Sequence, residues 1–151
     1  MSAAADLETQ AREIVAANRY MVLSTADGDG RPWVSPVWFA TADCVEFVWL
    51  SKPERRHSGN VRARPDIAIV VFDSSVAPGN ARALYVAARA EELDGAARDR
   101  CLEIYSAETV AQGLPVFTAA DVSHGGRWRL YRAVAGERFV LGPVDERLPL
   151  G

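Results

Sequence analysis

A succession of short segments rich in β-branched and aromatic residues most constrains the fold of this chain. Within residues 83–93 apolar side chains alternate with more polar ones, which predicts a strand with one buried face. Turn residues such as Asp27-Gly28-Asp29-Gly30 separate this segment from others of the same kind. Further strands are expected at residues 20–25, 33–40, 44–50, 67–73, 128–134 and 138–141, the last two pairing around Ala135-Gly136. Pro36 lies inside one of them and predicts an edge, a bulge or an open stretch of sheet.

Two further segments have the apolar spacing of helices, at residues 7–17 and from Gly95 to about Ser106. At 151 residues the chain is long enough for one compact domain, so we expect a single domain over residues 1–151. Mostly antiparallel strands with a few helices predict a mainly β fold with α additions (α+β), built as a β-barrel.

The composition excludes several functional classes. A net charge of −3 argues against a dedicated nucleic-acid-binding protein. No apolar run approaches the length of a membrane span, and residues 1–8 do not resemble an export signal. Cys44 and Cys101 lack the spacing of a zinc site or a disulfide framework, so no metal is expected. We therefore expect a cytoplasmic protein with a small-molecule ligand.

One stretch departs from this acidic background. Five of the 17 Lys and Arg residues fall between Lys52 and Arg64, together with His57, one of two histidines. Ser51 and Glu54 have the spacing of a capping box, which predicts a helix beginning after Ser51 and ending before Pro65. Cations in the first turn of a helix oppose its dipole unless an anion compensates them, so this stretch predicts a phosphate-binding site. The alternative is a solvated basic helix, in which Arg62 and Arg64 complement the C-terminal dipole.

The residues from Gly30 to Val71, "GRPWVSPVWF…CVEFVWLSKPERRHSGNVRARPDIAIVV", resemble the pyridoxamine 5′-phosphate oxidase-like flavoproteins. The resemblance implies an antiparallel split β-barrel with flanking helices, FMN as cofactor and a homodimer. The strand-end hydroxyl of the family corresponds to Ser51, and its basic pair to Arg56 and His57. Similarity extends weakly through "ALYVAARAEEL" and "RWRLYRAVAGERFVLG". The cofactor-binding residues that follow are Ser35, Pro36, Val37, Leu50, Ser51, Lys52, Arg56, His57, Trp128 and Arg129.

The expected activity is that of an FMN-dependent oxidoreductase with an unidentified substrate. His57 replaces a more usual lysine or arginine, which predicts a weaker or pH-dependent phosphate contact. The sequence ends without the basic, histidine-bearing segment that grips pyridoxamine phosphate in the oxidases, so vitamin B6 oxidation is not expected. Two alternatives remain, namely a reductase that uses the deazaflavin coenzyme F-420, and a non-catalytic flavin- or haem-binding protein. No catalytic side chain is identified, because the flavin supplies the chemistry.

Overall fold

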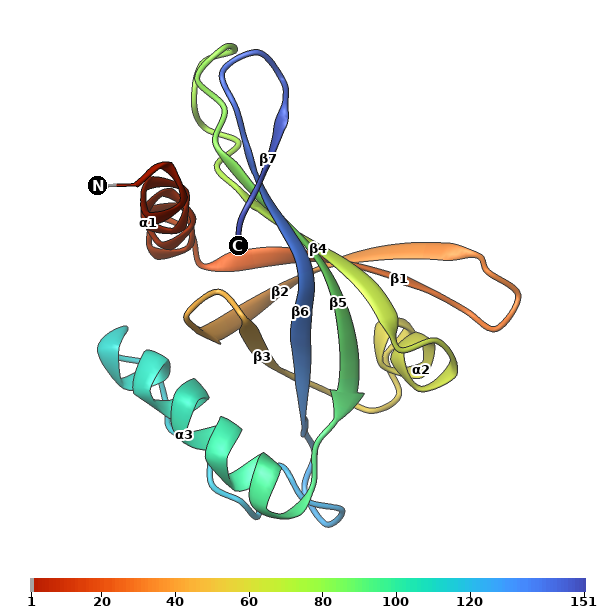
Figure 1. The fold of residues 1–151 in the computed structure, drawn as a ribbon. Helices are drawn as coiled ribbons and strands as arrows, with labels where there is room; N and C mark the ends of the chain where they lie inside the picture. The colour runs from red at the N-terminus through yellow and green to blue at the C-terminus, as the bar shows by residue number, and fades with distance from the viewer. Residues whose placement is uncertain (1) are drawn as a thin grey trace.

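The computed structural model describes residues 2–151 as a closed antiparallel barrel of six strands with three helices (Figure 1). The strands run in the order β3-β2-β1-β4-β5-β6, and pairing of β3 with β6 closes the barrel. A short seventh strand continues the sheet beside β6. The strands are β1 (Tyr20–Ala26), β2 (Pro32–Ala42), β3 (Glu46–Ser51), β4 (Asp66–Phe72), β5 (Ala83–Glu92), β6 (Arg129–Leu141) and β7 (Arg147–Pro149).

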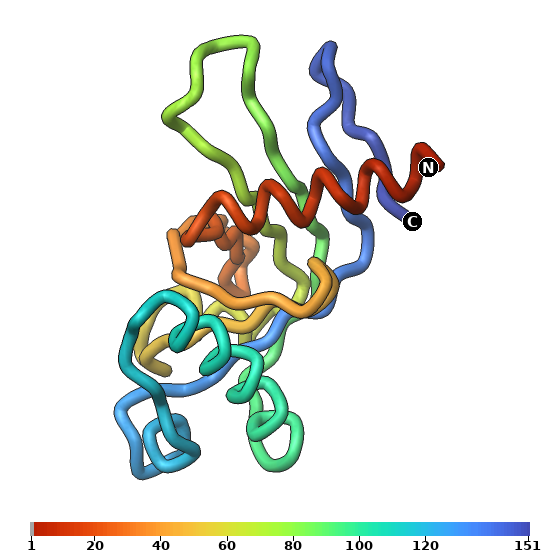
Figure 2. The backbone as a smooth tube through the Cα atoms, turned by 90° about the vertical axis from the view of Figure 1, so that its left-hand side faces the viewer, coloured from red at the N-terminus to blue at the C-terminus, as the bar shows by residue number. Residues whose placement is uncertain are grey.

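The three helices lie at different places around the barrel (Figures 1 and 2). Helix α1 (Ala3–Ala16) packs on β4, β5 and β6, and α3 (Gly95–Ala111) packs on the outer faces of β2, β3 and β6. Helix α2 (Arg56–Ala63) follows β3 and lies beside the β1–β2 hairpin. Among residues 2–151 no helix is long and apolar enough to cross a membrane.

Two apolar clusters stabilise this arrangement. The larger one fills the barrel and includes Met21, Phe47, Trp49 and Tyr131, all without exposed surface. The second lies between α3 and the outer side of the barrel and includes Tyr105, which is 6% exposed. Burial of apolar surface on both sides of β3 and of the second half of β2 explains why residues 37–40 and 47–50 are all apolar.

Most strands expected from the sequence are confirmed, but the pair expected around Ala135-Gly136 is wrong. Residues 129–141 form the single strand β6, which pairs with β5 on both sides of a register shift between Val86 and Ala88. Gly136 lies at this irregularity, where a Cβ would come within 3.4 Å of the Ala87 carbonyl oxygen. The glycine therefore allows a close approach inside a bent strand and does not form a turn. Helix α3 also extends five residues beyond the expected Ser106, and β7 was not expected.

Strand β2 changes partners along its length. Residues 32–38 pair only with β1, whereas residues 39–42 pair with β3. The outer half of the β1–β2 hairpin consequently extends beyond the barrel (Figure 1). Pro36 lies in this half, opposite Val22, as expected for a proline at an open edge.

Helix α2 holds the extended hairpin in place. Asn60, only 6% exposed, donates from Nδ2 to the Thr25 hydroxyl at 3.0 Å. Arg64 donates to the carbonyl oxygens of Asp27 and Gly28, at 2.7 and 3.0 Å. Arg64 therefore fastens the tip of the hairpin, which is a different role from the expected complement to the helix dipole.

The outer face of the barrel carries a row of directly opposed side chains that crosses six strands. Because opposed residues of antiparallel strands project on the same face, these side chains form one band, here called the apolar row. Part of this row lines a groove of about 460 Å³, in which Ser24 and Tyr85 carry the only polar groups among the side chains of the ten lining residues. The apolar row consists of Pro36, Val22, Val70, Tyr85, Phe139 and Pro149.

Arg138 of β6 joins α1 to the turn between β2 and β3 and to Gly151 after β7. Its side chain is 8% exposed and bonds both carboxylate oxygens of Glu8, at 2.7 and 3.2 Å. It also donates to the carbonyl oxygens of Cys44, at 3.4 Å, and Gly151, at 2.7 Å. A buried cation with four acceptors is expected to be a point on which stability depends.

We predict that Arg138→Met lowers the free energy of unfolding by about 2–4 kcal/mol, because it leaves the Glu8 carboxylate and two carbonyls without their donor. Urea denaturation measures the change. Arg89→Met is the control, since its ion pair with Asp66 joins two largely exposed side chains and should contribute less than about 1 kcal/mol. Equal effects of the two substitutions would contradict the assigned role.

Candidate functional site

The candidate site begins where β3 ends. Ser51 still pairs with Arg129 of β6, so its backbone cannot start a helix. Helix α2 begins only at Arg56, with Arg55 as its N-cap, and the expected capping box of Ser51 and Glu54 is therefore wrong. The Ser51 hydroxyl instead lies 2.8 Å from Nε2 of His57.

The turn over residues 52–57, here called the cationic turn, has the features of an anion site. The N-cap residue Arg55 makes no side-chain capping bond, and the first turn of α2 holds no acidic residue. The N–H groups at the start of this helix therefore have no side-chain acceptor from the cap. A second serine, Ser58, fixes the turn by donating to the Lys52 carbonyl at 2.9 Å.

The cations of this turn also lack partners. Within residues 2–151 the side chains of Lys52, Arg55 and Arg56 make no hydrogen bond or ion pair. Most other arginines of the described chain are bonded to a carboxylate or a carbonyl. Three unpaired cations at one uncapped helix start are the donor set that a phosphate monoester requires.

Two tryptophans flank the cationic turn. The Arg56 guanidinium stacks over the Trp33 ring at 4.1 Å, and the Lys52 ammonium lies 5.7 Å from the centre of the Trp128 ring. Stacking occupies the face of a guanidinium and leaves its in-plane N–H groups available to an anion. The site thus combines cations with two indole surfaces, one from β2 and one from the segment before β6.

The remaining residues expected on β2 lie along the same strand as Trp33. Val37 is 8% exposed, and Ser35 stands opposite the buried Leu23, so both side chains project toward the inner face. Pro36 projects to the outer face, where it belongs to the apolar row. Trp33 projects on the same face of β2 as Ser35 and Val37, and it reaches the cationic turn, where it contacts Arg56.

Arg129 holds the segment that carries Trp128. Its guanidinium donates to the carbonyl oxygens of Ser123, Gly126 and Trp128 at 2.7–3.0 Å and to that of His124 at 3.3 Å. These bonds fix the loop in front of β6 and so position the indole beside Lys52. Leu50, paired with Leu130, packs in the outer apolar cluster next to this loop.

The structure therefore brings together Ser51, Lys52, Arg56, His57 and Trp128, and it adds two residues that the sequence did not assign. Trp33 joins the site because Arg56 stacks on its ring, and Arg55 joins it because it occupies the N-cap position of α2. A cation–aromatic pair between residues 23 positions apart has no sequence signal. Arg55 is among the five cations that the sequence singles out, and the start of α2 adds that it is the N-cap residue. Among residues 2–151 no group of three or more His, Cys, Asp or Glu side chains could hold a metal ion.

Comparison with known proteins identifies relatives of the fold. Residues 7–129 match the family model described as pyridoxamine 5′-phosphate oxidase. No curated protein sequence matches the chain.

Three solved structures illustrate the similarity. A haem-binding protein from Mycobacterium smegmatis is 16% identical with a TM-score of 0.75; the match covers 99% of this chain and 58% of that protein. An FAD-binding protein from Mesorhizobium loti is 20% identical with a TM-score of 0.64, over 93% and 94% of the two chains. An F420 reductase is 21% identical with a TM-score of 0.57, over 79% and 87%. The chain is thus similar in fold to proteins with different named ligands, and it spans 58% of the first.

We predict that the pKa of His57 lies below the ordinary histidine value of 6.5, because burial and then the charge of Arg55 disfavour the imidazolium. Since the folded state binds this proton less well than the unfolded state, His57 contributes stability that is fully present above pH 6.5. That stability is lost as the pH falls through the lowered pKa. NMR titration of the ring protons measures the pKa, which Arg55→Gln should raise. A midpoint of 6.5 or higher in the unsubstituted protein would contradict the prediction.

Proposed function

The chain belongs to the pyridoxamine 5′-phosphate oxidase family, and from this premise we propose that it is an FMN-dependent oxidoreductase. The observation that carries the proposal is the cationic turn, where three unpaired cations surround the uncapped start of α2. A phosphate dianion would compensate both the charges and the helix dipole.

Each residue of the site has a specific part in this proposal. Arg56 donates to the phosphate through the edge of its guanidinium while Trp33 supports its face. Lys52 adds a second charge, held close to Trp128 of the same chain. The flavin ring lies along residues 35–37 of β2, where the strand has only one partner. When bound, FMN supplies the electron transfer, and the protein orients it and excludes water.

The Ser51–His57 pair gives the phosphate contact a dependence on pH. When His57 is neutral, its Nε2 can accept a hydrogen bond from the Ser51 hydroxyl. When His57 is protonated, Nε2 donates to Ser51, and the hydroxyl proton becomes free to bond the phosphate. A phosphate therefore favours the protonated histidine, opposing the burial that lowers its pKa.

Two alternatives use the same residues. Coenzyme F-420 also carries phosphate, and an F420 reductase shares the fold, so a deazaflavin-dependent reductase is the closest alternative. A non-catalytic flavin- or haem-binding protein is the second, favoured by the haem-binding structural neighbour. Haem would require an axial ligand such as histidine. His57 already contacts Ser51 through Nε2, which leaves the exposed His124 for this part.

We also propose that the working unit is a homodimer, with the apolar row at its interface. The row and its groove are mainly apolar, although the Arg147 guanidinium lies 4.3 Å from the centre of the Tyr85 ring. Apolar surfaces of this kind mark interaction sites in soluble proteins. A twofold partner would cover this surface with its own copy. Pro36 belongs both to the row and to the β2 segment proposed for the flavin, so the interface would border the cofactor.

The cellular setting is part of the same proposal. Cys44 and Cys101 are both buried and unpaired, which is compatible with the reducing cytoplasm. We propose a cytoplasmic enzyme with a small-molecule substrate, contained in one domain over residues 1–151.

We predict that Arg56→Ala weakens FMN binding by roughly ten- to a hundredfold, the effect of losing one charged hydrogen bond to phosphate. Quenching of flavin fluorescence on titration of the apoprotein measures affinity. Arg82→Ala is the matched control, because Arg82 pairs with Glu13 on α1, outside the cationic turn. Arg64→Ala is unsuitable as a control, because Arg64 fastens the hairpin. Equal losses for Arg56→Ala and Arg82→Ala would contradict the phosphate assignment.

The same titration with FMN, FAD, coenzyme F-420 and haem separates the alternatives. FMN should bind most tightly, and an NAD(P)H-driven turnover with an added acceptor should follow in the loaded protein. Tighter F-420 binding would favour the deazaflavin reductase. Tighter haem binding that His124→Ala removes would favour the haem-binding alternative.

We predict that Val70→Glu converts the dimer to a monomer at micromolar concentration, because it places a charge in the middle of the apolar row. Light scattering measures the mass. Val110→Glu is the matched control, since Val110 is 64% exposed on α3 and lies outside the row. A flavin-loaded monomer in the unsubstituted protein would contradict the dimer.

A further inference from the structure

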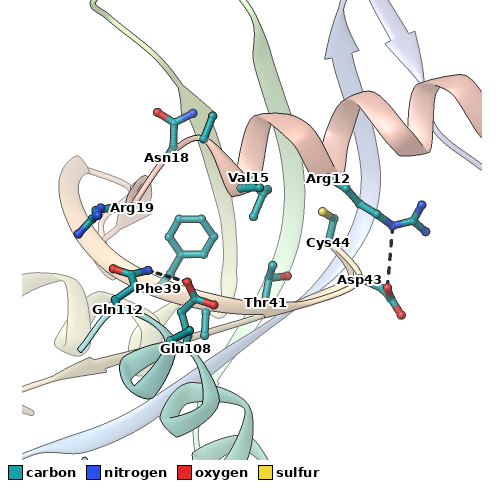
Figure 3. A pocket seen from close by; sticks show the side chains of 14 residues that line it. Arg12, Val15, Asn18, Arg19, Phe39, Thr41, Asp43, Cys44, Glu108 and Gln112 are labelled. Atoms are coloured by element: carbon teal, nitrogen blue, oxygen red, sulfur yellow. Dashed lines mark hydrogen bonds and ion pairs between the residues drawn. The ribbon is translucent and has the colours of Figure 1, made fainter. Parts of the chain in front are cut away.

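A second pocket lies at the opposite end of β2 from the cationic turn. It has a volume of about 640 Å³ and lies between the end of α1, β2 with the turn that follows it, and the last turn of α3 (Figure 3). Its volume is within the range of small-molecule sites. No residue of the cationic turn lines it, so it is independent of the function proposed above.

One wall of this pocket is the turn between β2 and β3. Asp43 and Cys44 have φ angles of 53° and 56°, and the Val45 N–H donates to the Ala42 carbonyl at 3.0 Å. These are the features of a type I′ turn, the usual two-residue connection of a β-hairpin. Arg12 of α1 approaches this turn, with its Nε 4.0 Å from the Asp43 carboxylate. The ion pair joins α1 to the turn at this end of the pocket.

The other end of the pocket holds a cation and an anion that do not meet. Figure 3 shows Arg19, on the segment after α1, apart from Glu108, on α3, with Gln112 next to Glu108 and the Phe39 ring to one side of both. No ion pair joins the two side chains, and within residues 2–151 Arg19 has no hydrogen-bonded partner. Glu108 accepts a hydrogen bond from the Gln112 amide, whose own oxygen accepts from Trp38 at 3.3 Å. These two hydrogen bonds fix the Gln112 amide, which in turn holds the Glu108 carboxylate in place.

We propose that this pocket binds a free amino acid with an apolar side chain. The α-carboxylate pairs with the Arg19 guanidinium, the α-ammonium pairs with Glu108, and the side chain lies on Phe39. A zwitterion satisfies the separated charges without adding net charge to the pocket. A doubly charged phosphate would instead face Asp43 and Glu108, and an uncharged ligand would leave Arg19 without a partner of opposite charge.

The test compares three probes that differ only in charge. L-Phenylalanine carries both charges, L-phenylalanine amide only the cation, and 3-phenylpropionate only the anion. Calorimetric or NMR titration should give a Kd on the order of 1 mM for L-phenylalanine, as expected for so small a ligand. Each analogue should bind about tenfold more weakly or worse, because one charged contact is lost.

Two substitutions assign the charges. Arg19→Gln should weaken L-phenylalanine and remove its advantage over the amide, while Glu108→Gln should remove its advantage over 3-phenylpropionate. Ala111→Trp, at an exposed position on the pocket wall, should abolish binding of all three probes. Arg82→Gln is the matched control and should leave every affinity unchanged.

The result that overturns the proposal is equal binding of the three probes, no saturable binding, or binding that Ala111→Trp leaves intact. FMN affinity, measured on the same variants, should not change. If the unsubstituted protein does not bind FMN, the proposed function is wrong but the amino-acid site is unaffected. The two failures are therefore distinguishable.

Discussion

The change of partner along β2 determines where the candidate site can form. Before Phe39 the strand pairs only with β1 and does not pair with β3, so the first half of β2 leaves the barrel as part of the β1–β2 hairpin. An isolated hairpin is marginally stable, and here α2 supports it through Asn60 and Arg64. The same helix contributes the cationic turn at its other end, which is why Trp33 and Arg56 meet.

The cations of the site differ from most other arginines of the described chain in their bonding partners. Arg138 is enclosed by acceptors, Arg129 is bonded to four loop carbonyls, and Arg64 to two. These are structural cations, whose removal leaves their backbone and carboxylate acceptors without donors. The cations of the cationic turn are held by aromatic stacking or left exposed. The difference between bonded and unbonded cations, more than the number of positive residues, distinguishes a binding site from a basic helix.

The barrel and most strand positions could be predicted from the sequence, because alternation and turn residues are local signals. The start of α2 could not. Ser51 and Glu54 have the spacing of a cap, but pairing of Ser51 with β6 commits the residue to a strand. The turn predicted at Ala135-Gly136 was wrong for a similar reason, since only the pairing with β5 shows that the strand bends there and continues. A long-range contact also gives Arg64 a structural role that its neighbours in sequence do not reveal, because its acceptors lie 36 and 37 positions away.

The apolar row has a consequence for how this chain can vary in length. Side chains alternate between the two faces of a strand, so one inserted residue in β4 would turn Val70 inward and bring a core residue to the surface. The same slip would break the opposed series from Pro36 to Pro149 at that strand. Insertions and deletions are therefore tolerated in turns such as residues 73–82 and excluded from the central strands. Related chains should differ in the length of their hairpins while keeping the number of residues in each strand.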